Sequence, residues 1–90
     1  LSAPTSVKVK AGNKMATVSW TKVKSANSYT VYYSTKKNSG FKKLTVIKNS
    51  ANIKKLSSGK TYYFKVVANK KAGKAVVASD FSKLVSAKIK

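Results

Sequence analysis

The chain has 90 residues, of which 20 are lysine and one, Asp80, is acidic, so its formal net charge is +19 at neutral pH. Ninety residues suit a single domain, residues 1–90, with one hydrophobic core. Cysteine and histidine are absent, which excludes disulfides and leaves too few ligands for a closed metal site, so we expect no metal and no cofactor. No apolar run is long enough to span a bilayer and the first four residues are not a signal peptide, so we expect no membrane insertion.

Alternating apolar and polar residues predict β-strands through the first half of the chain. The predicted strands cover residues 5–10, 14–20, 29–34, 41–48 and 50–55. A turn is expected over residues 11–13, and the alternation within 41–48 is too blurred to fix which side chains point inward. Trp20 shares its face with Ala16 and Val18, which favours a core position over a sugar-stacking platform.

The longest β pattern follows Leu56 and begins at a turn. Alternation predicts that one set of its side chains is core and that the other faces solvent. The predicted core set is Tyr62, Phe64, Val66 and Ala68, and the predicted solvent set is Tyr63, Lys65, Val67 and Asn69. The six residues from Leu56 to Tyr62, across Gly59, let the phenol reach a backbone group near Leu56, as in a tyrosine corner. A last strand is expected to begin at 75–79 and to resume over 84–90.

These motifs together resemble a known family. Four motifs carry the resemblance: Ala3-Pro4, Val18-Ser19-Trp20, Tyr29 to Tyr33, and the pattern Leu56-x-x-Gly59-x-x-Tyr62-x-Phe64-x-Val66-x-Ala68. Through them the chain resembles a fibronectin type III domain over essentially its whole length. The resemblance implies an all-β fold, a seven-stranded antiparallel immunoglobulin-like sandwich with Trp20 as its central aromatic residue. It also implies a spacer or binding module of an extracellular protein, rarely a catalyst, and the lysine-rich composition is similar to such modules in secreted or surface bacterial proteins.

Catalysis has few candidate residues. General acid–base chemistry needs a positioned histidine or paired carboxylates, and the chain has one acid. A Ser–Lys dyad needs a buried lysine, whereas the pattern places every lysine on an outer face or in a loop. Asp80 lies in a polar stretch, so we interpret it as a solvated turn residue rather than part of an isopeptide cross-link. We expect no catalytic site.

Two groups of residues are candidate binding sites. The first is an outward patch of Tyr32, Tyr63, Lys65 and Val67, because the family's sheet order makes the two tyrosine-bearing strands neighbours. Such a patch stacks a sugar or seats a neighbouring domain, or its residues simply steady the sheet by cross-strand packing. The second is the basic loop of Lys70, Lys71 and Lys74. The family often places ligand contacts in this loop, but the Arg-Gly-Asp tripeptide that binds integrins is absent.

The lysines themselves point to anionic polymers as partners, since like charges on a small domain repel each other and a polyanion relieves that repulsion. Cell-wall polymers, acidic polysaccharides and nucleic acid all qualify. The absence of arginine argues against sequence-specific reading of nucleic acid. Solubility alone is an equal explanation of the charge.

Three functional hypotheses follow. The first is a non-catalytic extracellular or cell-surface spacer or adhesion module, monomeric when isolated, whose partners are neighbouring domains of a larger protein. The second is a module that binds polyanions by diffuse electrostatics. The third is an engineered or consensus scaffold, suggested by the absence of Arg, Glu, Gln, His and Cys.

Overall fold

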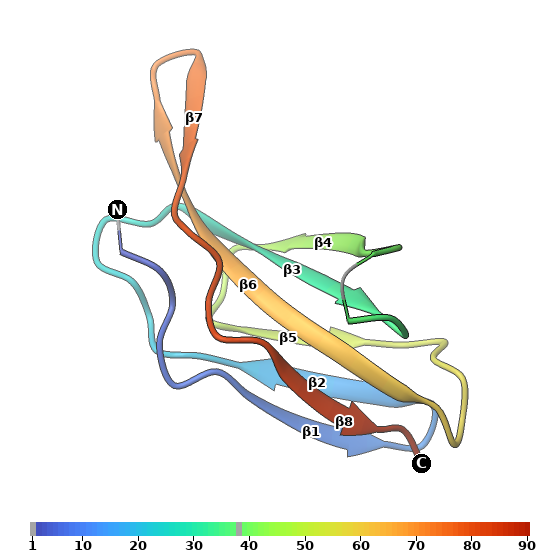
Figure 1. The fold of residues 1–90 in the computed structure, drawn as a ribbon. Helices are drawn as coiled ribbons and strands as arrows, with labels where there is room; N and C mark the ends of the chain where they lie inside the picture. Colours follow the sequence, from blue (N-terminus) through green and yellow to red (C-terminus); the bar gives the residue numbers. More distant parts are fainter. Residues whose placement is uncertain (1, 38) are drawn as a thin grey trace.

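The computed structural model describes residues 2–37 and 39–90, which form two antiparallel sheets packed face to face (Figure 1). The strands are β1 Lys8–Gly12, β2 Met15–Ser19, β3 Ser28–Ser34, β4 Lys42–Val46, β5 Ser50–Ile53, β6 Thr61–Ala72, β7 Ala75–Ala78 and β8 Val85–Lys88. The first sheet has the order β1-β2-β5, and the second has the order β4-β3-β6, with both β7 and β8 paired to β6. The predicted all-β sandwich is therefore confirmed. Within the described residues, no helix is long and apolar enough to cross a membrane.

The last predicted strand is interrupted, which is why the described residues form eight strands where seven were predicted. Between β7 and β8, two serines keep the chain beside β6. The amide of Val66 donates to Oγ of Ser82 (2.8 Å), while the Ser82 amide donates to the Val66 carbonyl (2.8 Å). Ala68 and Ser79 make the same reciprocal pair at 2.9 and 2.8 Å. Because the serine hydroxyls replace main-chain carbonyls as acceptors, these two amides of β6 stay paired although the strand breaks.

The first strand begins at Lys8, later than the predicted residue 5. Ser6 adopts a left-handed conformation (φ 53°), which interrupts an extended chain, and the carbonyl of Thr5 accepts a hydrogen bond from the amide of Thr21 (2.9 Å). The following turn also moves: β1 runs through Gly12, so Asn13 and Lys14 form the turn rather than residues 11–13.

The register of β4, which the sequence left open, is set by pairing with β3. Leu44 lies opposite Val31, and Lys42 lies opposite Tyr33. Directly opposite residues in an antiparallel pair point to the same face. Lys42 therefore shares the inward face of Tyr33, and the prediction that every lysine sits on an outer face or in a loop is wrong for this residue.

The core lies between the two sheets and follows the predicted alternation in β2, β3 and β6. Its buried members are Ala16, Val18, Trp20, Tyr29, Val31, Ala51, Ile53, Leu56, Tyr62, Phe64, Val66, Ala68 and Ile89. Trp20 packs edge-on against Tyr29, with ring centroids 5.3 Å apart at 61°. The amide of Ser57 donates to Oη of Tyr62 (3.0 Å), so the expected tyrosine corner is present.

The molecule is elongated, with principal extents of 42 × 22 × 20 Å. Beyond the sandwich, β6 and β7 continue as a hairpin that projects from one end (Figure 1). The N-terminal segment lies near the base of this hairpin, and the C-terminus lies at the opposite end of the domain.

Candidate ligand-binding face

The outer face of the β4-β3-β6 sheet carries most of the predicted ligand patch. Tyr32 lies directly opposite Lys65, and Tyr63 pairs with Ser34 two positions further along the same two strands. Tyr32, Lys65 and Tyr63 are half-buried on this face. The ring of Tyr32 packs edge-on against Phe81, with centroids 5.0 Å apart at 81°. The aromatic partner of Tyr32 thus comes from the segment between β7 and β8. The predicted patch contained no residue from this segment.

Lys65 is held between two phenylalanine rings. Its Nζ lies 3.9 Å from the ring centroid of Phe81 and 4.4 Å from that of Phe41. Nearby, Nζ of Lys43 lies 5.5 Å from the centroid of Tyr32. All three distances fall within the range of attractive cation–π contacts. Tyr32, Phe41, Lys43, Lys65 and Phe81 therefore form one cluster, here called the cation–aromatic patch.

Two loops bring the phenylalanines onto this face. Phe41 directly precedes β4 and follows Gly40, whose φ of 69° turns the chain. Phe81 lies between Ser79 and Ser82, the two residues whose hydroxyls are bonded to β6. Sequence periodicity could not place either ring, because alternation assigns faces only within a strand. The available signal was compositional: Phe81 is a large aromatic residue in an otherwise polar stretch.

Val67 does not belong to an exposed patch, contrary to the prediction. Its side chain is only 5% exposed, and Asn69, also expected in solvent, is buried and donates from Nδ2 to Oγ1 of Thr30 (2.9 Å). Phe81 lies over this side of β6, as its contact with Lys65 shows. The outer face of β6 is therefore partly covered. For this reason the apolar–polar alternation along β6 does not separate its buried residues from its exposed ones.

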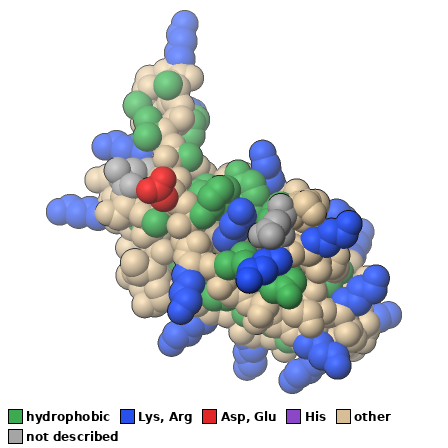
Figure 2. All heavy atoms as spheres, viewed as in Figure 1, with side chains coloured by type: hydrophobic (Ala, Val, Ile, Leu, Met, Phe, Trp, Pro, Cys, Tyr) green, Lys and Arg blue, Asp and Glu red, His purple; other side chains and the backbone are tan. Residues whose placement is uncertain are grey.

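The chemistry of the patch suits binding rather than proton transfer. Figure 2 shows hydrophobic side chains gathered among lysines near the middle of the viewed face, while other lysines project around the outline of this view. Aromatic rings offer flat apolar surfaces, and the ammonium groups offer positive charge. No group of three or more potential metal ligands occurs among residues 2–37 and 39–90.

The basic loop lies apart from this patch. Lys70, Lys71 and Lys74 are exposed on the projecting hairpin of β6 and β7. Five residues of extended strand separate Lys70 from Lys65, a span of roughly 17 Å. The amide of Lys71 donates to Oδ1 of Asn27 (2.6 Å), which ties the hairpin's base to the preceding loop. The two predicted sites are therefore separate surfaces.

The buried phenol of Tyr62 is electrostatically perturbed. The hydrogen bond from the Ser57 backbone is the largest cause and lowers the pKa of Tyr62 below its usual value, and the charges of Lys60 and Lys42 act in the same direction. Leu56, at the start of the corner, is buried, as are Trp20 and Tyr62. These three residues belong to the core that holds the sandwich together.

The fold and this face define an immunoglobulin-like β-sandwich module. The family model for the fibronectin type III domain matches residues 2–83, so the chain belongs to that family. Domains of this family are generally non-enzymatic modules of larger proteins. No curated protein matches the chain.

Solved structures support the same assignment. The FN1–FN3 domains of chicken CNTN1 are similar at 25% identity and a TM-score of 0.81; the match covers 98% of this chain but 31% of that one. An Fn3-like protein from Clostridium thermocellum has 23% identity, a TM-score of 0.79 and coverages of 92% and 86%. A β-1,2-glucanase from Parabacteroides distasonis has 20% identity, a TM-score of 0.76 and coverages of 99% and 14%. The last two likenesses concern the fold alone.

Proposed function

We propose that this domain is a non-catalytic spacer or adhesion module of a larger, extracellular or cell-surface protein. The observation that carries the proposal is the placement of the N-terminal segment and the C-terminus at opposite ends of an elongated sandwich (Figure 1). Neighbouring domains joined at these ends extend the chain instead of folding back on it. The match to a domain that occupies 31% of one similar chain and 14% of another is consistent with a modular role.

A tandem polypeptide of two copies tests the spacer role. Small-angle X-ray scattering should give a maximum dimension near twice the 42 Å length of one copy. A compact particle with the copies side by side would contradict the spacer proposal.

Mutation of Phe81 to Ser tests for adhesion through the cation–aromatic patch. The measurement compares how well the variant and the parent are retained on immobilised neighbouring domains.

Binding of anionic polymers is a second candidate function, supported by the net charge of +19 and by the lysines that project around the outline of the molecule in Figure 2. Diffuse attraction of this kind weakens steeply with salt, with a slope of about −0.9 per phosphate contacted for duplex DNA. Titrations of heparin and duplex DNA at several salt concentrations check it. Similar affinities at equal charge density support diffuse binding, and affinity that does not change with salt would contradict it.

A further inference from the structure

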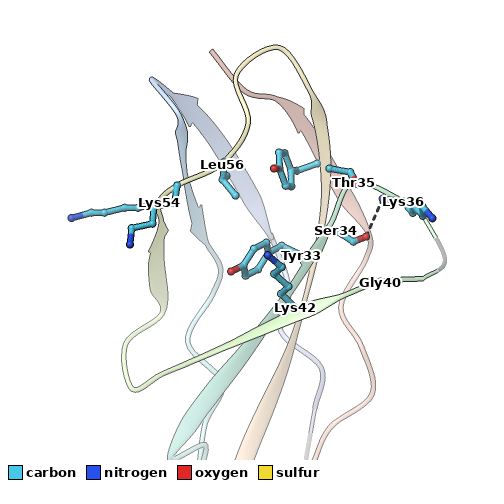
Figure 3. Close-up of a pocket in the computed structure, with 10 residues that line it drawn as sticks. Tyr33, Ser34, Thr35, Lys36, Gly40, Lys42, Lys54 and Leu56 are labelled. Carbon is cyan, nitrogen blue, oxygen red and sulfur yellow. Dashed lines mark hydrogen bonds between the residues drawn. The ribbon is translucent and has the colours of Figure 1, made fainter.

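A cleft of about 420 Å³ opens at the edge of the sandwich, away from the cation–aromatic patch (Figure 3). One wall comes from the paired ends of β3 and β4, and the other comes from the chain just after β5. The side chains that matter for its chemistry are Tyr33, Lys42, Lys54, Lys55, Leu56 and Tyr62. A volume of this size falls in the range of small-molecule sites.

The charge of the cleft is entirely positive among its described lining residues. Lys42 is the inward-facing lysine of β4, and Figure 3 shows its side chain beside the ring of Tyr33. Lys54 and Lys55 stand on the opposite wall, where Lys55 has a left-handed backbone (φ 61°), and Lys54 points outward from the rim in Figure 3. The chain's single acid, Asp80, is not among the lining residues. An anion entering this cleft therefore meets Lys42 on one wall and the positive charge of Lys54 and Lys55 at the opposite rim.

The neutral lining supplies a hydroxyl donor and apolar surface. Oη of Tyr62 accepts the Ser57 amide, so its own proton remains available to donate. The hydroxyl of Ser34 is already used, since it donates to the Ser39 carbonyl (2.6 Å) and accepts from the Lys36 amide (2.9 Å). Leu56 and the ring of Tyr33 provide an apolar wall. This mixture is unlike a pure phosphate site, which needs no apolar wall.

From these features we infer that the cleft binds one acidic sugar residue of an anionic polysaccharide, with its carboxylate at Lys42 and its ring against Tyr33. A uronic acid carries a compact anion, hydroxyl groups and a weakly polar ring face. The cleft has a partner for each of these: lysine ammonium groups, a phenol hydroxyl and an apolar wall. The inference rests on the polyanion-binding function proposed above and goes beyond it, because a dedicated cleft predicts that certain lysines matter more than others.

An exposed lysine on the other sheet provides a matched test. Lys42 faces the cleft, whereas Lys10 of β1 lines no part of it and lies outside the cation–aromatic patch, so Lys42→Gln and Lys10→Gln remove equal charge from exposed strand positions. Trigalacturonate is titrated into each protein at 0.15 M salt and followed by amide chemical shifts, with a neutral trisaccharide as ligand control. We expect Lys42→Gln to weaken binding about tenfold, equivalent to about 1.4 kcal/mol, and Lys10→Gln to change it less than about twofold. Shifts should cluster at residues 33–36, 54–57 and 62.

Several results would overturn the inference. Equal weakening by the two variants would show that only net charge matters, and equal binding of the neutral trisaccharide would remove the role of the carboxylate. Inorganic sulfate that produces the same shifts at the same concentrations would show that the sugar ring is irrelevant. If trigalacturonate fails to bind while long polygalacturonate still binds in low salt, the cleft is wrong and the diffuse function survives. If neither binds, both fail.

Discussion

The two halves of β6 differ completely in burial although they are one continuous strand. From Tyr62 to Asn69 the strand lies between β3 and the chain around β8, and Phe64 is 0% exposed. Beyond Asn69 the same strand pairs only with β7 among the described strands. There residues 70–72 of β6 are exposed, and Val76 and Val77 of its partner β7 are 64% and 50% exposed. Apolar side chains alone therefore do not make a core. A second layer has to cover them, and the sandwich ends before the hairpin does.

The largest expected difference between the halves is in core packing. Mutation of Phe64 to Ala removes a fully buried ring and should lower the free energy of unfolding by about 3–5 kcal/mol. Mutation of Val77 to Ala on the hairpin should change it by less than about 0.5 kcal/mol, because the side chain is already half exposed. Urea denaturation of both variants provides the measurement. Comparable losses would mean that the hairpin is covered in solution.

Two adjacent tyrosines sharpen the comparison within the buried half. Mutation of Tyr62 to Phe deletes the acceptor of the Ser57 amide and should cost about 1 kcal/mol. Mutation of Tyr63 to Phe, on the outer face, should leave stability within about 0.5 kcal/mol of the parent. Guanidinium denaturation of the pair distinguishes them. A larger loss at Tyr63 would show that the inward face has been assigned to the wrong residues.

A smaller, pH-dependent effect should accompany the Tyr62 substitution. The pKa of Tyr62 is lowered in the folded state, chiefly by the Ser57 hydrogen bond, so between that value and the unfolded pKa the unfolded chain binds more protons. The resulting stabilisation is complete above the unfolded pKa and is lost as the pH falls through the folded one. The stability gap between the parent and Tyr62→Phe should therefore widen as the pH rises through the lowered pKa of Tyr62 toward the usual tyrosine value of about 10. A constant gap, measured by thermal unfolding, would show that the phenol does not ionise more readily in the fold.

The sequence predicted the sandwich well because alternation is a local property. Val18, Val31 and Phe64 are fully buried where alternation placed them. The tyrosine corner was also foreseeable, since it depends only on the spacing between Leu56 and Tyr62.

The sites were less predictable because they depend on contacts between distant segments. Phe81 reaches Lys65 only because Ser79 and Ser82 bond to β6, and no spacing rule encodes that arrangement. Lys42 faces inward because β4 pairs in one register, and a shift of one residue would exchange it with Lys43. Val67 is buried on what was expected to be a solvent face, the face of β6 over which the Phe81 side chain lies.

The smallest expected effect on global stability is at the hairpin tip, where Gly73 has a φ of 63° in the turn between β6 and β7. Mutation of Gly73 to Ala meets no atom within 4 Å of the new Cβ, so its cost of about 1 kcal/mol comes only from the backbone conformation. Because the hairpin lies outside the core, this cost should open the hairpin locally and leave the urea midpoint unchanged. Hydrogen exchange at amides 70–77 should accelerate about fivefold, while Lys74→Ala, the adjacent control, leaves it unchanged. A shift of the urea midpoint by Gly73→Ala would show instead that the two halves of β6 unfold as one cooperative unit.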